Sequence, residues 1–182
     1  EDGRHRNVAI SVDGSQFAAI HGSWTQLPEL VVSGGNTREK RLTNSHSKDA
    51  VGIYQRVPTS RFTYTNRHGL PVQGTLMLPK GVKPGTPMPL LVYVYGGPLG
   101  EDHQVTDGQT DRFGIYVTET LGYAYATIDP RGTSGHGGVF GKANYEQPGV
   151  PQVEDLVDGV KYLQGKYAID AKKVGIHGWS FG

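Results

Sequence analysis

The feature that most constrains this chain is the pentapeptide Gly178-Trp179-Ser180-Phe181-Gly182, which directly follows a short apolar run. That run, residues 173–177, predicts a buried strand. A strand that leads straight into Gly-x-Ser-x-Gly is typical of a tight, strained turn that presents a serine hydroxyl above a sheet. Side chains two residues either side of the serine would collide with the turn, so glycine is expected at both positions. We therefore predict that Ser180 is a nucleophile.

Composition excludes several other kinds of chemistry and partner. The 182 residues contain no cysteine, which excludes disulfides, thiolate zinc sites and a cysteine nucleophile. The formal net charge is +1 and no long run of one sign occurs, which argues against nucleic acid or an anionic membrane as the main partner. No apolar run approaches the length of a membrane span, so no membrane contact is expected.

Metal and cofactor patterns are weak throughout the sequence. Glu101, Asp102 and His103 are adjacent, and adjacent side chains rarely point at one ion; no helical His-Glu-x-x-His spacing occurs either. The glycine-rich run at 132–141 lacks the lysine and the spacing of a phosphate-binding loop. We expect neither a metal nor a cofactor.

Residues 7–46 predict a small all-β unit. Strands are expected at 7–10, 16–20, 29–32 and 38–42, with turns at Asp13-Gly14 and Gly34-Gly35-Asn36. Four strands in so few residues match one blade of a β-propeller, and a plain antiparallel sheet is the alternative. Residues 47–60 carry little pattern and are interpreted as a connection.

The remaining residues predict an α/β unit. A hairpin is expected from 61–65 and 72–78, followed by buried strands at 90–95 and 124–128 and helices at 111–121 and 151–166. The second helix should bury one apolar stripe, formed by Val153, Leu156, Val157, Val160 and Leu163. Strand, helix, strand, helix, strand predicts a parallel sheet covered on both faces.

Four motifs together resemble one known family. Tyr95-Gly96-Gly97-Pro98, Asp129-Pro130-Arg131-Gly132, Val153-Glu154-Asp155-Leu156 and the Ser180 pentapeptide occur in the order and approximate spacing of the prolyl oligopeptidase family. Residues 8–182 are most similar to its dipeptidyl peptidase IV branch. The resemblance implies the last blade of a β-propeller at 1–55. It also implies the N-terminal part of an α/β-hydrolase domain at 56–182, a mainly parallel sheet with flanking helices.

The resemblance also implies a serine peptidase activity on short peptides, of the post-proline dipeptidyl type, that proceeds through a serine acyl-enzyme. The alternatives are an acylaminoacyl peptidase or esterase on the same fold, and a non-catalytic binding protein. The resemblance further favours a periplasmic or secreted location and allows a homodimer. In an α/β-hydrolase the acid and the histidine follow the serine along the chain. None of the seven histidines fits that order, so we expect a fragment of a longer enzyme.

Two further groups complete the predicted site. Tyr95 resembles the family's oxyanion tyrosine, and the backbone N–H of Phe181 is the second expected donor; the alternative is that Tyr95 is a core residue.

Three other residues are expected to have structural roles. Arg131 is expected in a structural ion pair rather than on a substrate carboxylate. His177 is expected to pack in the core, and His136-Gly137-Gly138 to form a flexible surface loop.

Overall fold

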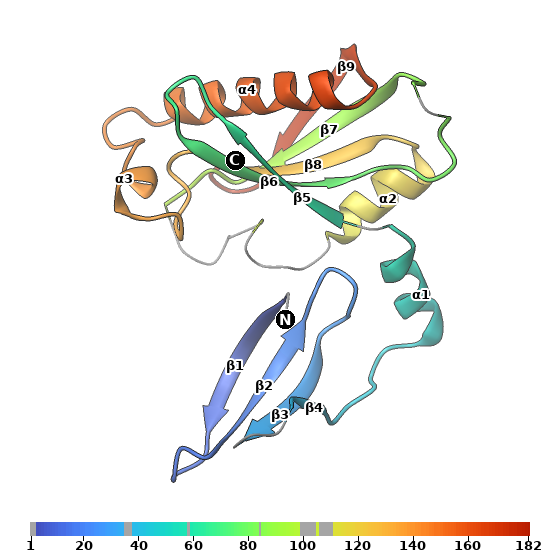
Figure 1. Ribbon diagram of the computed structural model, residues 1–182, viewed down its shortest axis with the longest axis vertical. Coiled ribbons are helices and arrows are strands. Elements are labelled where there is room, and N and C mark those ends of the chain that lie inside the picture. The colour runs from blue at the N-terminus through green and yellow to red at the C-terminus, as the bar shows by residue number, and fades with distance from the viewer. Residues whose placement is uncertain (1–2, 35–37, 58, 84, 99–104, 106–110) are drawn as a thin grey trace.

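The computed structural model describes residues 3–182 except 35–37, 58, 84, 99–104 and 106–110 (Figure 1). Its N-terminal part is an antiparallel sheet with the strand order β1-β2-β3-β4. The strands are β1 (Arg4–Ile10), β2 (Gln16–Gly22), β3 (Glu29–Gly34) and β4 (Lys40–Arg41). All four predicted strands are confirmed, although β4 is only two residues long. The turn predicted at Gly34-Gly35-Asn36 lies partly outside the described residues.

A helix, α1 (Lys48–Arg56), occupies part of the segment 47–60 that was interpreted as a connection; no helix was predicted there. Ser47 caps the helix by accepting a hydrogen bond from the backbone N–H of Ala50, with Asp49 in the first turn. Tyr54 and Val57 are buried. Together with the partly buried Ala50 and Val51, they form the apolar face of α1, and the tertiary burial of this face stabilises the helix.

The second sheet has the order β5-β6-β8-β7-β9. Its strands are β5 (Thr59–Thr65), β6 (Pro71–Met77), β7 (Met88–Val94), β8 (Ala124–Asp129) and β9 (Ile169–Gly178). Strands β5 and β6 form the predicted hairpin, and β6 runs antiparallel to β8. Strand β7 pairs in parallel with β8 on one side and β9 on the other, as the alternation of strands and helices predicted.

Helices lie on both faces of this sheet, and the pleat of β7 divides the core between them. Leu90 and Val92 face α4 (Val150–Lys166), where they cluster with Leu156 and other apolar residues. The alternate residues of β7 pack toward α2 (Arg112–Thr120) and α1 in a second cluster. Figure 1 shows α4 on one side of the strands and α2 on the other.

Two predictions about burial were partly wrong. Leu156 and Leu163 are buried, but Val153 and Val157 on the same predicted stripe are 59% and 40% exposed. Helix α4 instead buries an adjacent face through Gly159, where an added Cβ would lie 2.8 Å from the Tyr64 hydroxyl.

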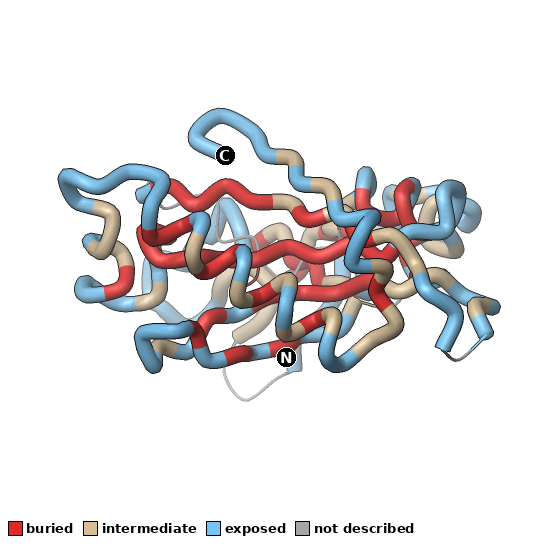
Figure 2. The backbone as a smooth tube through the Cα atoms, turned by 90° about the horizontal axis from the view of Figure 1, so that it is seen from above, coloured by how far each residue is buried: buried red, intermediate tan, exposed pale blue. Residues whose placement is uncertain are grey.

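Strand β9 was predicted to be buried and is largely exposed beyond its first residues. Figure 2 shows the stretch that leads to the C-terminus as mostly exposed, beside the buried strands. Among the described residues, β9 pairs only with β7, so one edge of β9 has no neighbouring strand. The apolar residues Val174 and Ile176 of this edge strand are 37% and 61% exposed.

Candidate active site

Ser180 lies in a tight turn that begins where β9 ends. Its φ of +57° is in the left-handed region, which only three non-glycine residues adopt in the described part of the chain. A serine in this conformation costs on the order of 1–3 kcal/mol, which the surrounding structure must offset. The backbone N–H of Gly182 donates to the carbonyl of Trp179 at 3.0 Å and closes the turn. The strained turn predicted from the pentapeptide is therefore observed.

The two flanking glycines are required by close backbone contact. A Cβ on Gly178 would lie 2.4 Å from the carbonyl carbon of Gly182 and 2.7 Å from the Val94 carbonyl oxygen. A Cβ on Gly182 would lie 2.0 Å from that same oxygen. The turn thus folds back on itself and onto the end of β7. The collision predicted within the turn is confirmed; the carbonyl of Val94 is a second obstacle that the sequence did not reveal.

Tyr95 lies beside this turn, in the loop that follows β7. Val94 and Gly178 are paired in neighbouring parallel strands, which brings the two following loops to the same edge of the sheet. The centroids of the Tyr95 and Phe181 rings are 6.3 Å apart. The Tyr95 ring also folds over Gly97, where an added Cβ would lie 2.7 Å from Cε1 of the ring. The structure therefore brings together Tyr95, Phe181 and Ser180, the three residues predicted for the site.

The described histidines are engaged away from Ser180. Five of them contact other groups: His5 and His21 contact Glu39, His46 the Pro28 carbonyl, His68 Glu154, and His136 Asp129. The sixth, His177, packs against the rings of Tyr93, Phe113 and Tyr125. Burial lowers the pKa of His177, although the negative charge of Asp111 acts in the opposite direction. The lowered pKa favours a neutral imidazole. His177 thus packs against aromatic rings, but it is half-buried rather than in the core as predicted.

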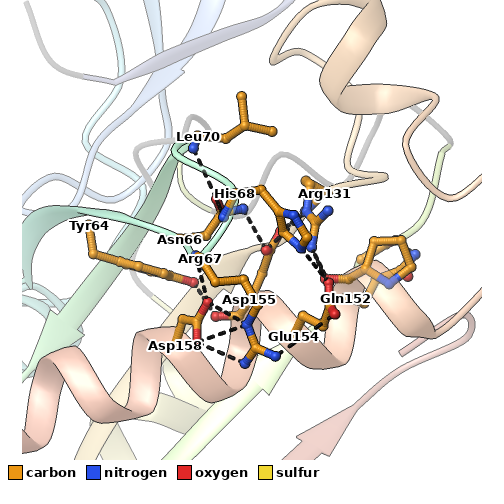
Figure 3. A network of polar contacts seen from close by, with 12 residues as sticks. Tyr64, Asn66, Arg67, His68, Leu70, Arg131, Gln152, Glu154, Asp155 and Asp158 are labelled. Atoms are coloured by element: carbon orange, nitrogen blue, oxygen red, sulfur yellow. Dashed lines mark hydrogen bonds and ion pairs between the residues drawn. The ribbon is translucent and has the colours of Figure 1, made fainter.

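Arg131 belongs to an ionic network on α4 (Figure 3). Its Nε lies 3.0 Å from the buried carboxylate of Asp155, and its backbone N–H donates to the same carboxylate at 2.7 Å. Glu154 accepts a further hydrogen bond at 2.8 Å. Burial alone would lower the pKa of Arg131, but these carboxylates raise it above its ordinary value. The predicted structural ion pair is confirmed, and the guanidinium is committed to it.

The loop around His136 is held by more contacts than predicted. His136 contacts the buried carboxylate of Asp129 through Nε2 at 3.0 Å, and its side chain is 11% exposed. A short helix, α3 (Gly138–Gly141), follows and buries Phe140. The expectation of a flexible surface loop at 136–138 was therefore wrong for His136, because a buried acid holds its imidazole.

Gln152 was not singled out from the sequence. It is buried in the first turn of α4, and its Nε2 donates to the carbonyl of Gly96, next to Tyr95. The Oε1 of Gln152 accepts a hydrogen bond from the backbone N–H of Gly149. A glutamine three residues after the first residue of a helix start is a recognised sequence signal for this contact. Its contact with Gly96 joins residues 56 apart in sequence, and no local pattern predicts that.

One cluster has the composition of a metal site. The ligand atoms of His5, His21 and Glu39 lie within 4.8 Å of one another. However, the two imidazole rings are stacked, with centroids 4.3 Å apart and planes 7° from parallel. Ring-nitrogen lone pairs lie in the ring planes, so nearly parallel stacked rings do not direct them at one ion. The geometry instead suits one carboxylate that accepts a hydrogen bond from each imidazole. The triplet Glu101, Asp102 and His103 lies outside the described residues.

No helix in the described part of the chain has the length and apolar character needed to cross a membrane.

Comparison with known proteins gives consistent matches. Residues 109–182 match the Peptidase_S9 model, described as the prolyl oligopeptidase family. Human dipeptidyl peptidase 8 is 32% identical over 126 residues, which are 69% of this chain and 14% of that protein. The chain therefore spans about one seventh of that relative's length.

Solved structures match nearly the whole chain. A Bacteroides ovatus structure described as a dipeptidyl aminopeptidase IV superposes with a TM-score of 0.82 and 27% identity, covering 98% of this chain and 25% of that one. Porphyromonas gingivalis dipeptidyl peptidase 4 gives a TM-score of 0.80 at 23% identity, covering 96% of this chain and 25% of that one. These structural matches agree in fold. The family match, the 32% identity with human dipeptidyl peptidase 8 and the motif order show that the chain belongs to the prolyl oligopeptidase family.

Proposed function

We propose that this chain carries the nucleophile and the oxyanion donors of a serine peptidase that removes dipeptides from the N-terminus of short peptides. The observation that carries the proposal is the conformation of Ser180, at positive φ in a turn that packs against the loop bearing Tyr95. The match to relatives named dipeptidyl peptidases supports the substrate class. A preference for proline at the second position is part of the proposal.

The proposed reaction begins when the Ser180 hydroxyl attacks the scissile carbonyl. The serine proton passes to a histidine supplied by another part of the longer polypeptide. The phenol of Tyr95 and the backbone N–H of Phe181 donate to the oxyanion that forms. Collapse of this intermediate breaks the peptide bond, and the leaving amine takes the proton from the histidine. Water then hydrolyses the ester on Ser180 and regenerates the hydroxyl.

The domain assignment belongs to the same proposal. The sheet β1–β4 is the last blade of a propeller, at residues 1–55, and residues 56–182 begin an α/β-hydrolase domain. A four-stranded antiparallel meander followed by a sheet with parallel strands supports this assignment. So do the matches to dipeptidyl peptidase structures, which extend over both parts. A homodimer of the whole protein is also proposed.

The experiment that tests the activity uses the longer polypeptide in which this chain resides. It is incubated with a dipeptidyl-proline chromogenic substrate and, separately, with a fluorophosphonate that labels activated serines. We expect turnover and labelling that Ser180→Ala abolishes. Preference for an N-acetylated amino acid substrate or a simple ester would instead favour the acylaminoacyl peptidase or esterase alternative. An unlabelled, inactive wild type would favour a binding protein.

A further inference from the structure

A buried side chain, that of Gln152, holds the loop that carries Tyr95. Gly96, the next residue, has a φ of +66° and is buried together with Gly97. Its carbonyl oxygen accepts a hydrogen bond from Nε2 of Gln152 at 3.1 Å. Because a buried carbonyl needs a partner, this contact fixes the orientation of the Gly96–Gly97 peptide plane, which begins one residue after Tyr95.

The orientation of the Gln152 amide is determined by two different partners. Its Oε1 accepts from the backbone N–H of Gly149 at 3.0 Å, while its Nε2 faces the Gly96 carbonyl. A flipped amide would place two donors together at one end and two acceptors together at the other. Gln152 therefore connects the first turn of α4 to the loop after β7 in only one arrangement.

Packing leaves the Gln152 side chain little room to move. A Cβ added to Gly96 would lie 3.2 Å from Cγ of Gln152. A Cβ added to Gly132 would lie 2.8 Å from Nε2 of Gln152. Gln152 is thus wedged between the loops that follow β7 and β8. The ion pair between Arg131 and Asp155 binds α4 to the second of these loops, one turn further along the helix (Figure 3).

We propose that Gln152 is a positioning residue for the oxyanion hole: it holds the Gly96 carbonyl and so sets where the Tyr95 hydroxyl stands relative to Ser180. The inference rests on the proposed function. An oxyanion donor acts at 2.7–3.1 Å from the developing charge, by general experience with such sites, and a displacement of about 1 Å can cost about a hundredfold in rate. Substrate binding does not depend on this donor, so the loss falls on kcat.

The test is a double-mutant cycle in the longer polypeptide. Gln152→Leu keeps much of the volume and removes both hydrogen bonds. We expect kcat to fall at least tenfold with KM within about twofold. Tyr95→Phe alone should cost at least as much. The double variant should be no slower than Tyr95→Phe alone, because a positioning residue has nothing left to position. Gln164→Leu, on the same helix, is the matched control and should retain wild-type kinetics.

A second variant separates positioning from general stability. Gln152→Glu keeps the acceptor for Gly149 but faces the Gly96 carbonyl with an oxygen, which donates only when protonated. Its kcat relative to wild type at the same pH should rise as pH is lowered. Loss of packing alone would give a ratio that does not change with pH. Should Gln152→Leu fail to fold, the cycle is run with this variant.

The outcomes separate a failure of the proposed peptidase function from a failure of the role proposed for Gln152. If turnover does not depend on Ser180, the proposed function fails and the inference falls with it. If turnover depends on both Ser180 and Tyr95 while Gln152→Leu is silent, or its cost adds fully to that of Tyr95→Phe, only the inference is overturned. A silent Tyr95→Phe also overturns it.

Discussion

At the scale of single residues, the serine turn is limited by backbone contact. Gly182→Ala would put a methyl group 2.0 Å from the Val94 carbonyl oxygen, so the turn or β7 must shift. We expect Ser180-dependent turnover in the longer polypeptide to fall by about a hundredfold, as for displacements of about 1 Å, together with a lower melting temperature. Gly165→Ala, at an exposed helical glycine with no atom within 4 Å of the added Cβ, is the control. It should be neutral or stabilising by up to about 1 kcal/mol. Normal activity of Gly182→Ala would contradict the geometry.

Tyr95 allows a second test at this scale. Tyr95→Phe keeps the ring contact with Phe181 and deletes only the hydroxyl. If the hydroxyl donates to the oxyanion, kcat should fall by about a hundredfold or more while KM changes little. If Tyr95 is only a core residue, both constants should stay near wild type, since the apolar ring is retained. Steady-state kinetics beside a thermal melt decide between the two.

At the scale of elements, α4 carries two aspartates that differ sharply in environment. Asp155 is fully buried and accepts hydrogen bonds from Arg131 and Asn66, whereas Asp158 pairs with the partly exposed Arg67. Asp155→Ala leaves a buried guanidinium without its main partner and should lower the free energy of unfolding by about 3–5 kcal/mol. Asp158→Ala should cost about 1 kcal/mol or less. Urea unfolding of both variants tests this; equal losses would show that burial does not govern the network.

The elements themselves were predictable where local patterns agree with tertiary burial. The four N-terminal strands, the hairpin β5–β6 and the helices α2 and α4 follow from periodicity and turn residues. Helix α1 was missed because it is nine residues long and mostly polar, so the few apolar residues that it buries, Tyr54 among them, are a weak signal in the sequence. The exposure of β9 was missed because local sequence records how apolar a strand is, not which neighbours cover it.

At the scale of the whole molecule, the site depends on which strands are neighbours. The strained turn at Ser180 was predictable because it is local in sequence. The approach of Tyr95 was predictable only through the family's motif order, since it depends on β7 and β9 pairing in parallel. Gln152 was not predictable, because its role joins a helix start to a distant loop through one amide.

Stability toward acid is also a property of the whole molecule. Among the described carboxyls whose pKa is lowered, that of Glu29 is the most buried. Burial alone would raise the pKa of Glu29, but hydrogen bonds from Thr43, Ser45 and Arg41 outweigh it and lower the pKa to about 2. The carboxyls of Asp13 and Asp158 also have pKa values lowered to about 2 by hydrogen bonds. A lowered folded-state pKa means that the unfolded chain binds more protons. This stability is therefore present above the unfolded pKa and is lost as pH falls from 4.5 toward 2.

Glu29→Gln tests the contribution of this one carboxylate. The substituted amide group faces donors, including the backbone N–H of Ser45, and should lower the free energy of unfolding by about 1–3 kcal/mol at neutral pH. The difference from wild type should shrink as pH falls from 4.5 toward 2, because over that window the unfolded wild-type chain binds a proton at this carboxyl while the folded protein does not. Glu146→Gln, at an exposed position, is the control and should follow the wild-type profile. Urea unfolding at a series of pH values measures all three proteins. A Glu29→Gln deficit that stays constant down to pH 2 would mean that the carboxylate's charge contributes nothing to acid stability.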